Sequence, residues 1–249
     1  MLGLNTDVTY SNLYESNLPL FVSSNLECWL TVYEGITVNF TGGAIDKVTT
    51  WEDSSNTNKF IKLATGSEPE INGVYNDLVG VKFTGTTGGD ALKLVDAAGS
   101  NAEITLDRAD GGYTIAFIAT NEGFDSGSVL FGSRANNDSF IKFSDGGEIK
   151  FMAAGNETTF AFSPALNDEV FHSFMIVQQQ GGGIRLYINN VLAASDSNNN
   201  DFEFSMLGGN DGAPKNQAPS FIKQIILYND AISDTDRDAL YTNYISPLI

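Results

Sequence analysis

The sequence predicts an all-β fold: a two-sheet antiparallel β-sandwich of the jelly-roll kind, with a short C-terminal helix and an N-terminal arm. Short β-branched or aromatic runs with period-two alternation recur along the chain, as in strands that bury one face. Clusters of Gly, Asn, Asp and Ser separate these runs, and such residues build tight antiparallel turns. No helical run lies between the strand candidates, although a parallel α/β fold would need one.

The chain is expected to divide into two parts. Residues 1–25 include the polar, Asn- and Ser-rich stretch TYSNLYESNLPLFVSSN and are expected to form the arm. Residues 26–249 are expected to form one sandwich, because all-β domains of this size are common and the chain is long enough to bury a sizeable core.

Two segments show the sandwich pattern most clearly. In YTIAFIAT (residues 113–120) both alternating faces are apolar, which predicts a central strand buried on both sides. IRLYINNVL predicts a half-buried strand that runs into a turn. Asn189 and Asn190 suit a type I′ turn, because both central residues of that turn need positive φ.

One helix is expected after the last strand, in AISDTDRDALYTNYIS. Ser233 is the expected N-cap, with Asp236 three residues later and further acidic residues in the first turn. Leu240 and Tyr244 lie four residues apart and should face the core.

The charge balance excludes some partners. The chain has 31 acidic and 13 basic side chains, which gives a formal charge of −18 and opposes binding to nucleic acid or anionic lipid. The first residues, MLGLNTDVTY, carry no Lys, no Arg and no long apolar stretch, so we expect no secretory signal, no membrane insertion and folding in a cytoplasm. The single cysteine, Cys28, is expected to be a buried free thiol.

Four stretches occur in an order that is typical of one known superfamily: TWEDSSNTN, VKFTGTTGGDALKL, RLYINNVLAAS and IILYNDAISDTDRDAL. From about residue 26 to the end, the chain resembles the concanavalin A-like lectin/glucanase superfamily, in its laminin G-like branch. The resemblance implies a concanavalin A-like jelly roll. The chain departs from the family pattern at Asn56, where Gly is frequent, and in a longer loop between Phe83 and Asp90, which is therefore expected to be reshaped.

Catalysis is not expected. Retaining glycosidases of this superfamily need two carboxylates about 5–5.5 Å apart, and laminarinase-like members carry them in a Glu-x-Asp-x-(x)-Glu run. The nearest run here, EITLD from Glu103 to Asp107, lacks the central Asp. His172 is the only histidine, and its alternation with Phe174 and Ile176 indicates a structural, hydrogen-bonded residue.

The resemblance also implies two kinds of ligand site. Calcium could bind between loops at the edge of the sandwich, and its oxygen ligands would come from these residues: Asp53 with Asn56 and Asn58, Asp90, Asp196 and Asp201. The alternative is that these loops are simply solvated and acidic. Trp51 and Tyr75 could form an aromatic platform for a sugar, and the alternative for them is packing in the core or at its rim. No other cofactor is expected.

Three functions follow from these expectations. The opening MLGL, a polar arm and a laminin G-like domain resemble small structural proteins of tailed phages. The first hypothesis is therefore a virion surface protein, a head decoration or a tail- or fibre-associated protein. It would assemble in the host cytoplasm, dock to other virion proteins through residues 1–25 and contact host glycans. The second is a stand-alone, calcium-dependent carbohydrate-binding or adhesion module at a cell surface, and the third a glucanase-like hydrolase. Whether the chain forms a homo-oligomer stays open.

Overall fold

The computed structural model describes ten ranges of the chain: residues 25–39, 46–64, 67–75, 78–84, 89–121, 128–144, 147–163, 165–166, 170–215 and 219–249. For residues 46, 72–75, 78, 79 and 121 only the backbone is described. The predicted arm, residues 1–25, lies outside the described residues except for Asn25.

Strands dominate the described chain, as predicted. They are β1 Leu26–Thr31, β2 Ile36–Asn39, β3 Asp46–Glu52, β4 Lys59–Lys62, β5 Glu70–Tyr75, β6 Leu78–Phe83, β7 Leu92–Val95, β8 Ile104–Leu106, β9 Gly112–Asn121, β10 Val129–Gly132, β11 Phe140–Phe143, β12 Glu148–Ala153, β13 Asn156–Ala161, β14 His172–Gln179, β15 Ile184–Ile188, β16 Val191–Asp196, β17 Phe202–Phe204, β18 Met206–Leu207, β19 Gly209–Asn210, β20 Ala213–Pro214 and β21 Ser220–Tyr228. The helical segments are η2 Arg108–Asp110, α1 Asp234–Leu240, η3 Tyr241–Ile245 and η4 Ser246–Leu248.

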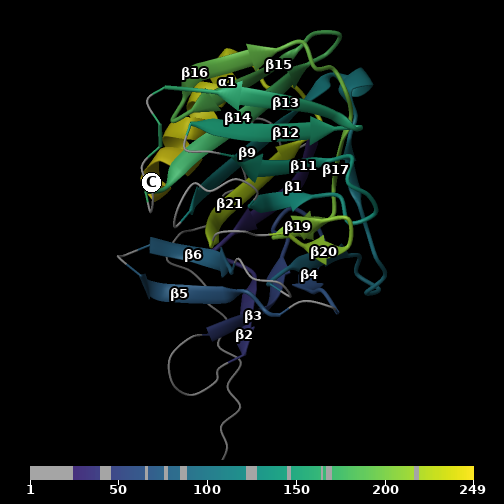
Figure 1. Cartoon of the computed structure of the whole chain (residues 1–249), viewed down its shortest axis with the longest axis vertical. Helices are drawn as coiled ribbons and strands as arrows, with labels where there is room; N and C mark the ends of the chain where they lie inside the picture. The colour runs from purple at the N-terminus through teal and green to yellow at the C-terminus, as the bar shows by residue number, and fades with distance from the viewer. Residues whose placement is uncertain are drawn as a thin grey trace, which may run out of the picture.

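The strands form two antiparallel layers (Figure 1). One layer has the order β1-β21-β9-β14-β15-β16. The other has the order β2-β3-β4-β7-β18-β10-β11-β12-β13. Pairing through β3, β5, β6 and β21 joins the layers along one side. The two predicted sheets are therefore layers of one nearly closed sheet, because hydrogen bonding passes from one layer to the other.

The main core lies between the two layers and is rich in phenylalanine. Phe117 of β9 stacks on Phe174 of β14, with ring centroids 4.9 Å apart. It also meets Phe131 of β10 edge-on at 5.3 Å, so aromatic contacts connect the two layers directly. The buried side chains between the layers form one connected cluster. This confirms the prediction that alternate residues of the strands supply a shared core.

A second apolar cluster covers the outer face of the β9 layer. Ser233 caps α1 through a bond from the Asp236 amide to the Ser233 hydroxyl, as predicted. Leu240 is fully buried, and Tyr244 packs edge-on to Trp29 with centroids 6.4 Å apart. Because the helical C-terminus covers this face, β9 is buried on both sides, which confirms the reading of residues 113–120 as a central strand.

The β15–β16 hairpin has the predicted type I′ turn. Asn189 and Asn190 have φ values of 48° and 65°. Asn190 donates from Nδ2 to Asp238 at 3.0 Å and accepts from Arg237 Nε at 3.0 Å. The guanidinium of Arg237 also lies 4.2 Å above the Tyr187 ring. These contacts hold the turn of the hairpin against α1.

Cys28 is a fully buried free thiol, as predicted. Burial raises the pKa of this thiol well above its ordinary value, and the nearby charge of Asp53 raises it further. None of the helices among the described residues is long and apolar enough to cross a bilayer.

Candidate functional site

The first group of predicted calcium ligands closes a turn by itself. Asp53 is only 3% exposed, and its Oδ1 accepts from the amides of Trp29 at 2.9 Å and Ser55 at 2.8 Å. Asn56 accepts from the Asn58 amide at 2.6 Å. These oxygens therefore already satisfy backbone N–H groups that fix the loop between β3 and β4.

The other predicted ligands also accept hydrogen bonds. Asp90 is 2% exposed and accepts from the Thr84 amide and hydroxyl at 2.9 and 2.5 Å. Asp196 accepts from the Thr158 hydroxyl at 3.1 Å, and Asp201 from the Arg108 amide at 3.1 Å. The structure does not bring the three groups together. Within the described ranges, no three His, Cys, Asp or Glu side chains lie close enough to hold a metal ion.

Of the two residues of the predicted aromatic platform, Trp51 does not lie on the surface. Trp51 is fully buried in the main core, and its indole nitrogen donates to the Thr31 carbonyl at 3.0 Å. Trp51 therefore packs in the core, which is the alternative to a sugar platform. Tyr75 ends β5, and its side chain lies outside the described part of the molecule.

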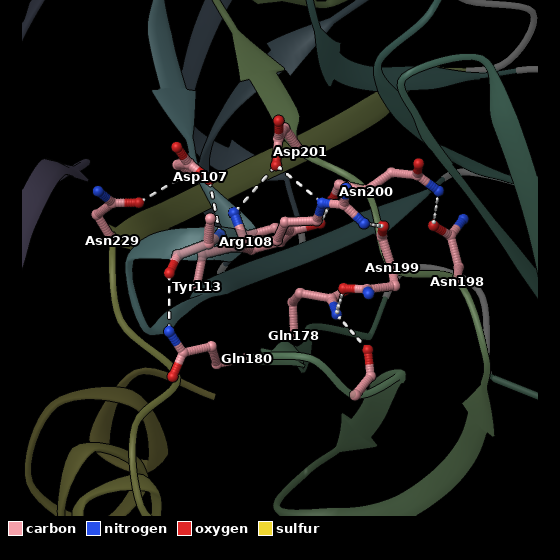
Figure 2. A network of polar contacts seen from close by, with 12 residues as sticks. Asp107, Arg108, Tyr113, Gln178, Gln180, Asn198, Asn199, Asn200, Asp201 and Asn229 are labelled. Atoms are coloured by element: carbon pink, nitrogen blue, oxygen red, sulfur yellow. Dashed lines mark hydrogen bonds and ion pairs between the residues drawn. The ribbon is translucent and has the colours of Figure 1, made fainter.

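A network of polar contacts gathers at one end of the sandwich (Figure 2). It joins the 107–113 segment, the end of β14, the 198–201 loop and the segment after β21. The Asp107 amide donates to Asn229 Oδ1 at 2.9 Å, and Gln180 Nε2 donates to the Ala109 carbonyl at 2.8 Å. Asn200 donates to Asn198 at 2.6 Å. We call this set of residues the polar loop cluster.

Gln178 and Arg108 connect the polar loop cluster internally. Gln178 is fully buried, and its Nε2 donates to the Gly182 carbonyl at 2.8 Å and to Asn199 Oδ1 at 3.1 Å. Arg108 forms an ion pair with Asp201 at 3.7 Å and also donates to the Asn199 carbonyl. The cluster is therefore rich in planar amide, carboxylate and guanidinium groups held in fixed positions.

Tyr113 forms the floor of the polar loop cluster. Its hydroxyl donates to the Asn200 carbonyl at 2.8 Å, and its ring belongs to the main core. Burial raises the pKa of this hydroxyl above its ordinary value. The charge of Asp201 raises it further, and Arg108 offsets part of the shift. The cluster is thus anchored directly to the hydrophobic interior.

A groove of about 360 Å³ opens at the opposite end of the same strands. Its apolar walls are Phe162, Leu166, Ile188, Val191, Leu192 and Ala193. Its polar lining comes from Ser163, His172 and Asn189.

His172 is held by the turn of the hairpin, which agrees with the predicted structural role. Asn189 accepts at Oδ1 from the Ser173 amide at 3.0 Å, so its Nδ2 must face His172 Nδ1, 3.1 Å away. Because Nδ2 is a donor, Nδ1 accepts, and the proton of the neutral ring lies on Nε2.

Sequence reasoning identified Asp196 and Asp201 but missed Arg108, Gln178 and Gln180. The signals were present as two glycine-rich stretches, DRADGG and QQQGGG, each beside a strand end. Only the pairing of β9 with β14 brings those two strand ends side by side. The groove was missed as well, because its walls come from strands of different layers.

Comparison with known proteins agrees with this fold. Residues 87–236, more than half of the chain, match the family model Laminin_G_3, described as the concanavalin A-like lectin/glucanases superfamily. The chain therefore belongs to the concanavalin A-like lectin/glucanase superfamily. No curated protein matches the sequence.

Among solved structures, receptor-binding domains of botulinum neurotoxins are similar in fold. The serotype D ligand-binding domain, solved with N-acetylneuraminic acid, has a TM-score of 0.59 at 14% identity, with coverage of 91% of this chain and 52% of that chain. The C/D mosaic receptor-binding domain has a TM-score of 0.56 at 12% identity, with coverage of 90% and 52%. The chain thus spans about half of each, and identity this low shows a shared fold alone.

Proposed function

We propose that the protein is a non-catalytic, lectin-like recognition protein on the surface of a bacteriophage virion, as a head decoration or a tail- or fibre-associated protein. The observation that carries the recognition role is the polar loop cluster. Four chain segments converge there on planar polar side chains, the kind of group that exchanges paired hydrogen bonds with sugar hydroxyls.

The similar structures support glycans as the first ligands to test. One toxin domain is described with N-acetylneuraminic acid, and another toxin study describes interaction with ganglioside molecules. Those ligands belong to chains about twice as long as the shared part, so they suggest a ligand class and no particular sugar. Calcium is a variable in the same test, since Asp201 lies in the cluster.

The carboxylates nearest to the glucanase pattern support a non-catalytic role. Glu103 accepts from the hydroxyls of Ser133 at 2.8 Å and Ser205 at 3.0 Å. Asp107 caps the short helix η2 by accepting from the Ala109 amide at 2.7 Å. Both groups therefore fasten loops.

A glycan array with and without calcium tests the recognition role. We expect specific binding that Asn200→Ala and Gln180→Ala reduce and that Asn243→Ala leaves unchanged, because Asn243 is an exposed amide on the C-terminal helical segment. No binding in either condition would refute glycan recognition. A strong hit that depends on calcium favours the stand-alone adhesion module, and turnover of β-glucans favours the hydrolase.

The virion setting rests on the resemblance of the sequence to phage structural proteins, and it has its own test. Residues 1–24 are removed, which keeps the bonds of Asn25 to Asn229 and Asp230 in place. We expect the shortened protein to fold, as judged by circular dichroism, and to lose binding to particles that lack the native protein. Retained particle binding would contradict docking through the arm.

A further inference from the structure

The groove lies where the two layers of the sandwich separate at their free side. β13 ends one layer and β16 ends the other, and among the described residues each pairs with a single strand. The two strands lie close together (Figure 1). At one end they are joined by Asp196 to the Thr158 hydroxyl at 3.1 Å and by Asn198 to the Asn156 carbonyl at 3.0 Å. Towards the other end they diverge, and the groove occupies the gap.

The side chains at the mouth of the groove are unusually apolar for a surface. Val191 is 69% exposed and Leu192 is 55% exposed, and both stand on the hairpin that α1 holds through Asn190. Behind them Ile188 and Leu166 pack against the main core. A rigid apolar surface that leads into the core marks a place where another apolar group can be buried.

The strand beside the groove offers backbone hydrogen bonds. The Phe162 amide bonds to the Gly147 carbonyl, and by alternation Phe160 forms the next bonded pair with β12. Thr159 and Ala161 therefore point their N–H and C=O groups away from β12, at the free edge and next to Phe162. An extended chain could pair there as an added strand.

The charge of the protein indicates which kind of extended segment could bind at this edge. The protein has a formal charge of −18. Beside the hairpin, Asp234 and Asp238 are 77% and 57% exposed, and the nearby Arg237 is only 13% exposed and already paired to both. A basic partner segment is therefore attracted, and an acidic one, including a second copy of this chain, is repelled.

We propose that this open edge docks an extended segment of a partner protein that carries one large apolar side chain flanked by basic residues. The segment pairs with the Thr159–Ala161 edge of β13, and its apolar side chain fills the groove between Phe162 and Leu192. This docking site is separate from the polar loop cluster, so it does not depend on glycan recognition.

The probe is a short fluorescein-labelled peptide with a central tryptophan, β-branched neighbours and a lysine at each end. We expect saturable binding in fluorescence anisotropy and amide shift changes at Thr159, Ala161 and His172 in NMR spectra. Leu192→Asp should weaken binding about tenfold or more, because it places a charge where apolar surface is buried. Val191→Asp provides a second exposed position should the first variant fold poorly. The matched control is Ile249→Asp, since Ile249 is an apolar residue 44% exposed elsewhere.

Two further peptides separate the contributions. Replacing both lysines by glutamates should weaken binding about tenfold at low salt, and less at high salt. Replacing the tryptophan by serine should abolish it. Four results would overturn the proposal: equal binding of the glutamate peptide, shift changes confined to the polar loop cluster, perturbation of the groove by chito-oligosaccharides in place of the peptides, or a dimer in sedimentation that Leu192→Asp dissolves.

Discussion

The two ends of the β15–β16 hairpin differ in how their polar groups are used. At the polar loop cluster, the buried side chain of Gln178 donates to the Gly182 carbonyl and to Asn199 Oδ1, and Arg108 donates to the Asn199 carbonyl. At the groove, Val191 and Leu192 lie exposed on β16, next to a turn that Arg237 holds through Asn190. One pair of strands therefore presents a hydrogen-bonded surface at one end and an apolar surface at the other. Both ends are held by hydrogen bonds. They differ in the side chains that they present: planar polar groups at the polar loop cluster and apolar groups at the groove.

Among the substitutions considered, replacement of Gln178 should have the largest effect on the free energy of unfolding. Gln178→Leu keeps a similar volume but leaves the Gly182 carbonyl and Asn199 Oδ1 without their donor. Because buried unpaired polar groups are costly, we expect a loss of about 2–3 kcal/mol in the free energy of unfolding. Urea denaturation followed by tryptophan fluorescence measures it. Leu192→Ser at the other end should change stability by less than about 0.5 kcal/mol, and equal losses would contradict the contrast.

A buried lysine on the helix-covered face gives a smaller, pH-dependent effect. Lys223 donates to the Leu248 carbonyl at 2.7 Å and lies 4.2 Å from the ring of Phe171, the residue before His172. Burial lowers the pKa of Lys223 from 10.5 to about 8. Between these two values the unfolded chain binds more protons than the folded one, so the contribution of this residue to stability rises with pH across that window.

The difference between wild type and Lys223→Met isolates this contribution from the tyrosines and Cys28, which titrate in the same region. Relative to the variant, the wild type should gain about 1–2 kcal/mol between pH 8 and 10.5. Thermal unfolding at a series of pH values measures the gain. A difference that is flat with pH would show that the amine is fully hydrated in the folded protein.

The regular parts of the fold could be predicted from the sequence because their causes are local. Alternation in residues 113–120 identified a central strand, paired asparagines identified a type I′ turn, and Ser233 with Asp236 identified a helix N-terminus. Each of these needs only neighbours within a few residues. The continuous joining of the layers through β3 and β5 was not predicted, since it depends on pairing between distant segments.

The sites were harder to predict for the same reason. Asp53 and Asp90 are residue types that bind calcium, but one oxygen of each accepts a hydrogen bond from a backbone amide that only the folded chain brings near. Trp51 lies in a loop-like sequence context. It is nevertheless buried in the core, where its indole nitrogen donates to the carbonyl of Thr31, 20 residues away. Arg108 and Asn199 meet across 91 residues of sequence. Residue type therefore suggested which ligands a side chain could bind. Contacts between distant segments determine whether that side chain lies at a site or in the folded interior.

A small effect on stability is expected at Asn189, where the change is read from the protonation of one ring nitrogen. Asp tolerates positive φ, so Asn189→Asp should preserve the turn and the bond from the Ser173 amide. The second carboxylate oxygen then faces His172 Nδ1 in place of a donor, and the ring proton must move to Nδ1. Nitrogen-15 NMR should show Nδ1 changing from pyridine-type to pyrrole-type, with a stability change below about 1 kcal/mol. If Nδ1 already carries the proton in the wild type, Asn189 does not orient the imidazole, and the polar lining of the groove is less fixed than the polar loop cluster.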